Sequence, residues 1–270
     1  MSTVLVTGAT GDLGMALVPA LRAAGHSVRA MSRQNGDVRA DLTTGSGLAD
    51  AVAGCEVVVH AASDSAGDPQ ATDVAGTQRL TEVCLAAGVG HLLYVSIVGV
   101  DRNPLPYYQA KLEAERIVAR SGLPYSIVRG AQFHEFLAGL LTARLRRGPV
   151  LFLPARFAAQ PVAAGDFAGH LVARVGAGPT GETTEFVGPE RLSGREILRA
   201  WRAAGGRVGP ALPVWRRDAA AKAFRMKSNI ASPDAPHGEI RWTQWLRDHP
   251  QRTESHDVGS TSRQFDHGQK

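Results

Sequence analysis

Short runs of Val, Ile and Leu alternate with helical stretches along the first half of the chain. The runs cover residues 3–7, 27–32, 56–61, 91–96 and 125–129. Residues 13–24, 74–87 and 107–121 carry apolar side chains at helical spacing between them. Strands that are apolar almost throughout are typical of a sheet covered by helices on both faces. The pattern predicts an α/β fold with a parallel, doubly wound sheet, whose ligand site lies at the carboxyl ends of the strands.

After an expected helix at 132–147 the pattern changes, because prolines interrupt shorter elements. We expect a core over residues 1–148 and a small C-terminal α+β substrate lobe over 149–248, interleaved with the core in one compact unit. Residues 249–270 are polar and predict a flexible tail. Four tryptophans in the last third are expected to pack this lobe, namely Trp201, Trp215, Trp242 and Trp245.

The composition is that of a globular protein, with 44% hydrophobic and 20% charged residues in a chain of 270. It excludes a fibre, a coiled coil and a disulfide-stabilised mini-protein. Cys55 and Cys84 are far apart and have no C-x-x-C or histidine partner, so neither a disulfide framework nor a zinc site is indicated. No apolar run approaches the roughly 20 residues of a membrane helix, and the first residues lead directly into a strand. We therefore expect a cytoplasmic protein without a membrane partner.

The net charge of +5 is unevenly distributed along the chain. Residues 1–190 hold 15 Lys and Arg against 17 Asp and Glu, a net −2, whereas residues 191–270 hold 15 against 8, a net +7. The basic residues of the last third are dispersed among Trp, Ala, Pro and acids. We therefore do not expect nucleic acid as a partner.

The string TGATGDLG places Gly8, Gly11 and Gly14 between the first strand and its helix. Gly8 permits a tight exit from the strand, Gly11 lets a pyrophosphate approach the backbone, and Gly14 lets the helix pack close to the sheet. The helix N-terminus supplies free N–H groups and a partial positive charge to the phosphates. The spacing is G-x-x-G-x-x-G, and the flanking strand and helix indicate a Rossmann-like dinucleotide site.

Residues after the second strand distinguish NAD from NADP. A carboxylate there would bind the ribose 2′-hydroxyl of NAD, but the chain has Ser32, Arg33 and Gln34. A guanidinium can pair with a 2′-phosphate, so Arg33 favours NADPH over NADH. The alternative is that Arg33 is an ordinary surface arginine.

Several ordered motifs resemble the atypical branch of the short-chain dehydrogenase/reductase superfamily, the NmrA-like NAD(P)H-binding proteins. They are TGATGDLG, HAAS at 60–63, VAGTQRLTEVCLAAGV, YVSIVGVD at 94–101, YYQAKLEAE at 107–115 and SGLPYSIVRGAQFHEF at 121–136. The resemblance spans residues 3–246. It implies that Asp41 and Leu42 flank the adenine, that residues 61–63 pass along the cofactor, and that Phe133 lies near the nicotinamide. The expected cofactor site is Gly8, Thr10, Gly11, Asp12, Leu13, Gly14, Ser32, Arg33, Asp41, Leu42, Ala61, Ala62, Ser63, Lys111 and Phe133.

Hydride transfer in such enzymes needs a proton donor. Tyr107 and Lys111 form Y-x-x-x-K, and their i,i+4 spacing puts both on one helical face. A nearby ammonium lowers the pKa of a phenol, which suits Tyr107 to donate a proton, while Lys111 would also hold the nicotinamide ribose. Ser96, at the end of a strand, could hydrogen-bond the substrate oxygen. The adjacent Tyr108 is an alternative donor.

The remaining candidates are weaker. His134 and Glu135 do not extend to H-E-x-x-H, because Ala138 stands where the second histidine would be, so no metal is expected. His60 is expected to be a hydrogen-bonded histidine at a strand end, with contact to cofactor or substrate as the alternative.

These features predict an NADPH-dependent reductase acting on a C=O, C=N or C=C bond of a small apolar molecule, and a homo-oligomer is one option for its assembly. One alternative is an NADP(H)-sensing regulator of the NmrA type that turns nothing over. Another is a structural subunit that docks on a larger assembly through the basic last third of the chain.

Overall fold

A parallel sheet forms the centre of the computed structural model, which describes residues 1–145, 151–154, 157–207, 209, 211–214, 219, 222–223, 226 and 228–252. Within these residues the sheet has seven strands in the order β3-β2-β1-β4-β5-β6-β9, every neighbouring pair being parallel. The strands are β1 (Thr3–Thr7), β2 (Ser27–Ser32), β3 (Val38–Arg39), β4 (Val57–His60), β5 (His91–Ile97), β6 (Tyr125–Gly130) and β9 (Thr183–Phe186). The first six follow the doubly wound order expected from the sequence.

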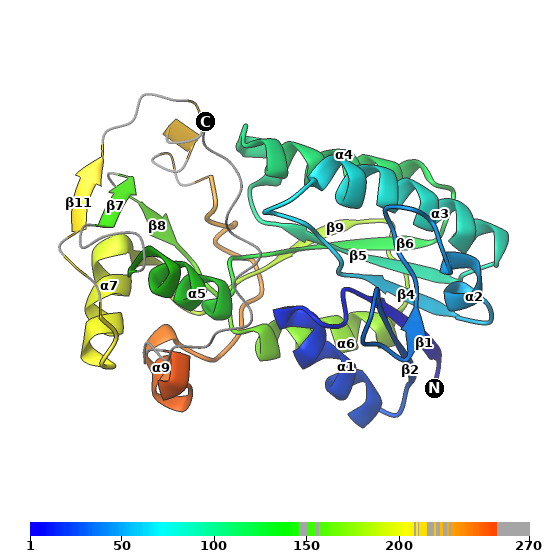
Figure 1. Ribbon diagram of the computed structural model, residues 1–270, viewed down its shortest axis with the longest axis horizontal. Helices are drawn as coiled ribbons and strands as arrows, with labels where there is room; N and C mark the ends of the chain where they lie inside the picture. The colour runs from blue at the N-terminus through cyan, green and yellow to red at the C-terminus, as the bar shows by residue number, and fades with distance from the viewer. Residues whose placement is uncertain are drawn as a thin grey trace.

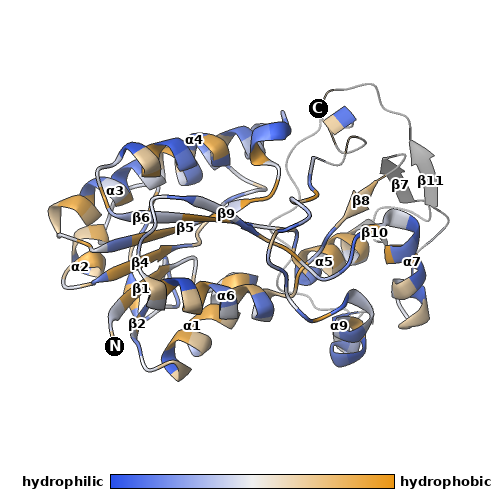
Figure 2. Ribbon diagram, turned by 180° about the vertical axis from the view of Figure 1, so that it is seen from behind, coloured by the Kyte–Doolittle hydropathy of each residue, from blue (hydrophilic) through white to orange (hydrophobic). Residues whose placement is uncertain are grey.

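Helices cover both faces of this sheet (Figure 1). Helices α1 (Asp12–Ala23) and α6 (Ala164–Ala177) lie on one face, and α2 (Leu48–Val52), α3 (Gly76–Ala86) and α4 (Pro106–Arg120) lie on the other. Each face has its own apolar core, with Leu17 and Leu171 in one and Leu80 and Val118 in the other. Figure 2 shows the strands between them as largely apolar. The predicted doubly wound fold is therefore confirmed.

A smaller lobe packs on a third apolar cluster. Its elements are α5 (His134–Leu145), α7 (Gly194–Ala203), α9 (Trp242–Asp248), and the strand pairs β8 (Ala158–Ala159) with β10 (Leu192–Ser193) and β7 (Leu151–Pro154) with β11 (Ala211–Val214). Trp201, Trp242 and Trp245 stack in sequence and are at most 2% exposed. Their predicted packing role is confirmed, and Trp215 lies outside the described residues.

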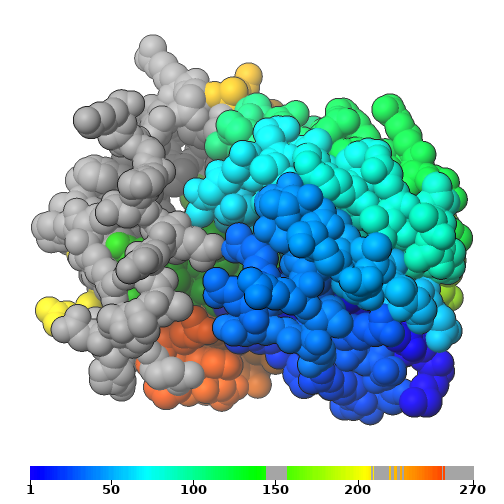
Figure 3. All heavy atoms as spheres, turned by 45° about the vertical axis from the view of Figure 1, so that its right-hand side comes forward, coloured from blue at the N-terminus to red at the C-terminus, as the bar shows by residue number. Residues whose placement is uncertain are grey.

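The core and the lobe are interleaved along the chain. Residues 164–186 return to the core as α6 and β9, whereas α5 contributes Leu137 to the lobe cluster. The division therefore differs from the expected boundary at residue 148. The segment after α9 ends in the short helix η3 (Pro250–Arg252), where an Arg252 nitrogen lies 3.9 Å from Asp12 Oδ1. Figure 3 shows α9, in orange, beside the blue N-terminal segments. Of the expected tail, residues 253–270 lie outside the described residues.

The helix expected at 74–87 begins earlier and in a different form. Residues Gln70–Ala75 form a π-helix, η1, that continues directly into α3. The sequence pattern does not predict this wider turn, and π-helical turns often occur at functional sites. It carries Asp73, which is 1% exposed. Another short helix, η2 (Val100–Arg102), follows β5.

His60 joins three elements at the carboxyl end of the sheet. Its Nδ1 lies 2.8 Å from Thr7 Oγ1 at the end of β1, and its Nε2 lies 2.9 Å from Thr77 Oγ1 in α3. The ring is fully buried, so it is the hydrogen-bonded strand-end histidine that the sequence favours. Burial lowers the pKa of His60 from 6.5 to about 3, and the charge of Lys111 adds to this effect.

In the described residues no helix is long and apolar enough to cross a membrane.

The depressed pKa of His60 makes stability depend on pH. In the folded state His60 does not bind the proton that it binds in the unfolded chain below about pH 6.5. The contribution of His60 to stability is therefore fully present above that pH and is lost as the pH falls toward 3. Between pH 7 and pH 5, His60 should lower the free energy of unfolding by about 2 kcal/mol. Urea denaturation at both pH values should show this loss, and His60→Asn should reduce it by that amount. An unchanged pH dependence in His60→Asn would contradict the expectation.

Candidate functional site: a dinucleotide cleft beside a buried lysine

The glycine-rich turn lies between β1 and α1, as expected. Gly8 has φ +70°, and a Cβ there would lie 2.7 Å from Ala62 Cα, so this position requires glycine. A Cβ on Gly14 would overlap the carbonyl oxygen of Gly8, so this glycine allows α1 to pack close to the turn. Gly11 is the extended N-cap of α1, where a Cβ would meet only Gly8 O, at 3.5 Å. The first N–H groups of α1 therefore start next to open space.

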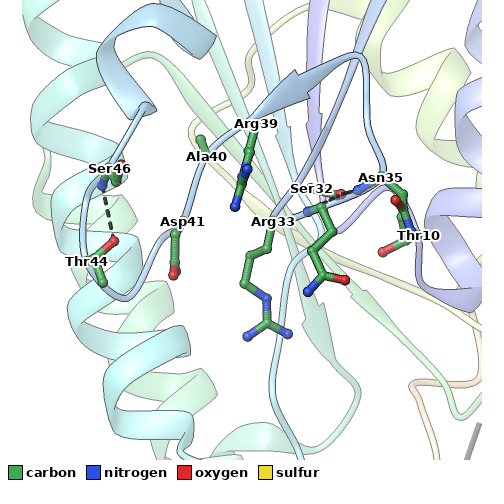
Figure 4. Close-up of a pocket in the computed structure, with 10 residues that line it drawn as sticks. Thr10, Ser32, Arg33, Asn35, Arg39, Ala40, Asp41, Thr44 and Ser46 are labelled. Atoms are coloured by element: carbon green, nitrogen blue, oxygen red, sulfur yellow. Dashed lines mark hydrogen bonds between the residues drawn. The ribbon is translucent and has the colours of Figure 1, made fainter.

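An open pocket of about 700 Å³ lies beside this turn and contains two arginines. Arg33, after β2, and Arg39, in β3, both lie in the pocket (Figure 4). Among the described residues no ion pair involves either guanidinium. Ser32 and Thr10 also line the pocket, and Ser32 Oγ accepts a 2.7 Å hydrogen bond from Asn35 N that holds the turn after β2.

The two residues expected around the adenine have different environments. Asp41 lines the pocket, and its carboxylate accepts hydrogen bonds from Thr43 N and Oγ1 at 2.8 and 2.7 Å. The Thr43 side-chain bond lowers the pKa of Asp41, and the charge of Arg33 also contributes. Leu42 instead packs into the core under α3 and is 5% exposed. Leu13, which belongs to α1, packs into the core on the other face of the sheet and is 6% exposed. Only their backbones could contact a cofactor.

Other expected cofactor residues follow the ends of β4 and β6. Ala62 N donates a 3.1 Å hydrogen bond to Thr7 Oγ1, which holds residues 61–63 against the glycine turn. Ser63 is exposed and directed toward α4 through its contact with Tyr107. Phe133, after β6, packs on Phe167 with ring centroids 5.6 Å apart. These segments lie at one edge of the sheet, as the parallel order requires.

The cleft fits a dinucleotide. Gly11 leaves room for a phosphate to approach the backbone, and the N-terminus of α1 adjoins this space. A wide pocket follows, with two arginines that form no ion pair within the described part of the chain. In the described residues no group of three or more His, Cys, Asp or Glu side chains could hold a metal. His134 packs between Trp242 and Trp245.

A hydrogen-bonded chain runs from α4 to the π-helix. Tyr107 Oη lies 2.8 Å from Ser63 Oγ, and Ser63 Oγ donates to Asp73 Oδ1 at 2.6 Å. The other carboxylate oxygen of Asp73 accepts from Asp64 N at 3.0 Å. Three segments that are distant in sequence thus meet at Asp73. The structure brings Tyr107 together with Ser63, which was expected only to lie along the cofactor.

Lys111 lies one turn after Tyr107 and is 3% exposed. Its Nζ donates to Val95 O at 2.7 Å, lies 3.6 Å from Asp73 Oδ1 and stands 4.3 Å from the centroid of the Tyr94 ring. Burial lowers the pKa of Lys111, while Asp73 acts in the opposite direction. Because the ammonium is directed at Asp73 and Val95 O, its positive charge is largely balanced by these two groups.

The expected lowering of the phenol pKa is therefore wrong. Burial raises the pKa of Tyr107 above its ordinary value, and the negative charge of Asp73 adds to that increase. At neutral pH Tyr107 is a protonated phenol. The neighbouring Tyr108 is 7% exposed, and its Oη accepts a hydrogen bond from Gln132 Nε2 at 3.3 Å. Of the two tyrosines, Tyr107 is the one in contact with the Ser63–Asp73–Lys111 group.

Ser96 is not brought into contact with Tyr107. It is 3% exposed, and its hydroxyl is buried without a hydrogen-bond partner in the described part of the chain. It lies opposite Arg129 in the pairing of β5 with β6. Arg129 is held by Glu115 and Asp101, at 2.8 and 3.1 Å.

Sequence reasoning missed Asp73 and Arg39. Asp73 lies in DVAGT, a string read only as the start of a helix, and its role depends on the π-helical turn that directs it inward. Arg39 lies in a two-residue strand beside β2, and only the pairing of Ser32 with Arg39 brings it next to Arg33. The β2–β3 adjacency of a doubly wound sheet is the signal that could have found it.

Comparison with known proteins agrees with this geometry. Residues 8–139 match the model of an NAD(P)H-binding family. The chain is 31% identical over 144 residues to 2-alkyl-3-oxoalkanoate reductase of Stenotrophomonas maltophilia, covering 43% of this chain and 44% of that protein. It is 29% identical over 160 residues to quinone oxidoreductase 2 of Escherichia coli, covering 54% of each. The chain thus spans only about half the length of these relatives.

A solved nucleoside-diphosphate-sugar epimerase from Staphylococcus aureus shares the fold. Its TM-score is 0.74 at 17% identity, covering 91% of this chain and 99% of that one. The sheet order, the glycine turn and the sequence matches point to the same group of proteins. Residues 8–139 match an NAD(P)H-binding domain, and the sequence relatives of the chain are named as a reductase and an oxidoreductase.

Proposed function

We propose that the chain is an NADPH-dependent reductase that reduces a C=O, C=N or C=C bond of a small apolar molecule, with Tyr107 as the proton donor. The observation that carries this proposal is a protonated phenol at the carboxyl edge of the sheet, where the dinucleotide cleft also opens. The phenol contacts Ser63 Oγ, and Ser63 binds Asp73, the ion-pair partner of the buried Lys111 ammonium. The names of the two reductases among its relatives support the reaction class.

Arg33 and Arg39 support NADPH rather than NADH. Both guanidiniums lie in one pocket, form no ion pair within the described residues, and supply positive charge for a 2′-phosphate. The last residue of β2 is Ser32, so no carboxylate stands there to repel that phosphate. Asp41 is at the end of the next strand, and its carboxylate is held by Thr43. The N-terminus of α1 would hold the pyrophosphate.

Within this proposal the residues divide the work. Bound NADPH would supply the hydride. Tyr107 Oη gives its proton to the atom at the other end of the reduced bond, which forms a hydroxyl from C=O, an amine from C=N or a C–H bond from C=C. Lys111 would hold the nicotinamide ribose, and its ammonium holds Asp73, the carboxylate that binds Ser63. Ala61, Ala62 and Phe133 would border the nicotinamide half of the cleft.

Replacing Arg33 tests the choice of cofactor. Arg33→Asp should raise the Kd of NADPH about 10- to 100-fold more than that of NADH, the range for losing a hydrogen-bonded charge pair. Fluorescence titration of the purified protein measures both constants. Arg195→Asp makes the same charge change in the first turn of α7, far from the pocket, and should leave both constants within about twofold. Equal losses for the two nucleotides in Arg33→Asp would remove Arg33 from this role.

Replacing Tyr107 tests the chemistry. Tyr107→Phe should lower turnover at least about 100-fold, because a positioned proton donor contributes that much, and should leave the Kd of NADPH within about twofold. NADPH oxidation is followed with a panel of quinones, ketones, imines and enones. Tyr108→Phe is the matched change on the adjacent residue. A loss confined to Tyr108→Phe would move the donor to Tyr108, and tight NADPH binding without any turnover in the wild type would favour a sensor.

A further inference from the structure

The hydroxyl next to Tyr107 comes from an unexpected strand. We propose that Ser63, and not Ser96, is the hydroxyl partner of Tyr107 in the reduction, and that Asp73 is a positioning residue that orients both Ser63 and Lys111. This inference rests on the proposed function and names further residues of the same site. It assigns work to the end of β4, where the HAAS string of residues 60–63 was expected only to border the cofactor.

Hydrogen counting fixes the direction of the bonds at Ser63. A serine hydroxyl has one proton and can accept further hydrogen bonds. Ser63 Oγ donates that proton to Asp73 Oδ1 at 2.6 Å, so Tyr107 Oη must be the donor in its 2.8 Å contact with Ser63. The O–H group of Tyr107 is therefore directed at Ser63 Oγ, which accepts its hydrogen bond. Bonds to a carboxylate are stronger than neutral ones, so Asp73 keeps Ser63 in this orientation.

Ser96 is in the wrong place for this task. Successive side chains of a strand alternate between faces, so Ser96 shares with Tyr94 the face of β5 that α4 covers. Its side chain is nevertheless 3% exposed and makes no hydrogen bond to Tyr107. Its hydroxyl has no exposed surface to offer to a substrate. Ser63 is exposed and contacts the reacting hydroxyl directly.

Asp73 is a buried hub. Its side chain is 0% exposed, and its oxygens face Ser63 Oγ, Lys111 Nζ and Asp64 N. Without this carboxylate Ser63 loses the acceptor that fixes its rotation, and the Lys111 ammonium is left buried without its ion-pair partner. The charged and titratable groups that act on Tyr107 are Asp73 from η1, Asp64 from the loop after β4, and Tyr108 from its own helix. Lys111 acts on Asp73.

The proton balance follows from this arrangement. As one substrate carbon gains hydride, the O–H bond of Tyr107 breaks and a new O–H, N–H or C–H bond of the product forms, for a C=O, C=N or C=C substrate respectively. Tyr107 is then a phenolate, and the Ser63 O–H turns from Asp73 to the phenolate oxygen. After the product leaves, a proton from solvent water restores the phenol, and Ser63 returns to Asp73. The exposed position of Ser63 gives water access to this end of the chain.

The first arm of the test uses the protein without cofactor or substrate. The chain has four tyrosines, so labelling each at Cζ with carbon-13 gives four resonances, and Tyr107→Phe identifies the relevant one. Ser63→Ala and Asp73→Asn should shift the Tyr107 resonance, whereas Ser96→Ala and Ser65→Ala should not. Ser65 is an exposed serine of the same loop and serves as the control. A Tyr107 resonance that is unchanged in Ser63→Ala would overturn the proposal.

The second arm measures turnover. Ser63→Ala should lower kcat about 10- to 100-fold with KM within about threefold, and the loss in Ser96→Ala should be at least about ten times smaller. Ser63→Thr, which keeps the hydroxyl, should restore most of kcat. A loss in Ser96→Ala as large as that in Ser63→Ala would contradict the proposal. If Asp73→Asn does not fold, the Ser63 variants decide.

The two arms separate this inference from the proposed function. If the wild-type protein oxidises NADPH with none of the acceptors in the panel, the proposed reductase function is contradicted, whatever the tyrosine resonances show. If the wild-type protein reduces an acceptor and Ser63→Ala has the same kcat, only the proposed role of Ser63 and Asp73 is contradicted.

Discussion

The ion pair between Lys111 and Asp73 is the interaction on which the site depends. Both side chains are almost completely buried, and removing one partner of such a pair typically costs about 3–5 kcal/mol. Helix α4 can place Lys111 under the sheet edge only because η1 supplies a carboxylate there. The same carboxylate holds Ser63, and Ser63 holds the proton of Tyr107. One buried pair therefore positions the proton donor, its hydroxyl neighbour and the ammonium together.

The sheet explains why these groups meet. Parallel strands end at one edge, so the glycine turn after β1, the loop after β4 and the segment after β6 share that edge although they are far apart in sequence. His60 ties β1, β4 and α3 beneath it through Thr7 and Thr77. The lobe, packed on its own tryptophans, begins at α5 directly after Phe133. In the proposed function, the core binds the cofactor and the neighbouring lobe selects the substrate.

The sequence was sufficient for the sheet, its flanking helices and the glycine turn, because periodicity and glycine spacing are local signals. It could also pair Tyr107 with Lys111 from their i,i+4 spacing. It could not identify Asp73, because a π-helical turn is decided by packing. Neither could it separate Ser63 from Ser96, since both stand near the carboxyl ends of apolar runs. Only the structure shows that Ser96, within β5, is buried and that Ser63, in the loop after β4, is exposed. The raised pKa of Tyr107 could not be predicted from the sequence either, because it comes from burial, to which the charge of Asp73 from a distant segment adds.

The most direct test of this account is a titration of the purified wild-type chain with NADPH and with NADH, followed on the same sample by NADPH oxidation with the panel of acceptors. The account predicts tighter binding of NADPH and turnover of at least one acceptor class. Failure to bind either nucleotide would contradict the assignment of the cleft, and it would leave the buried lysine, serine and tyrosine without the reaction proposed for them.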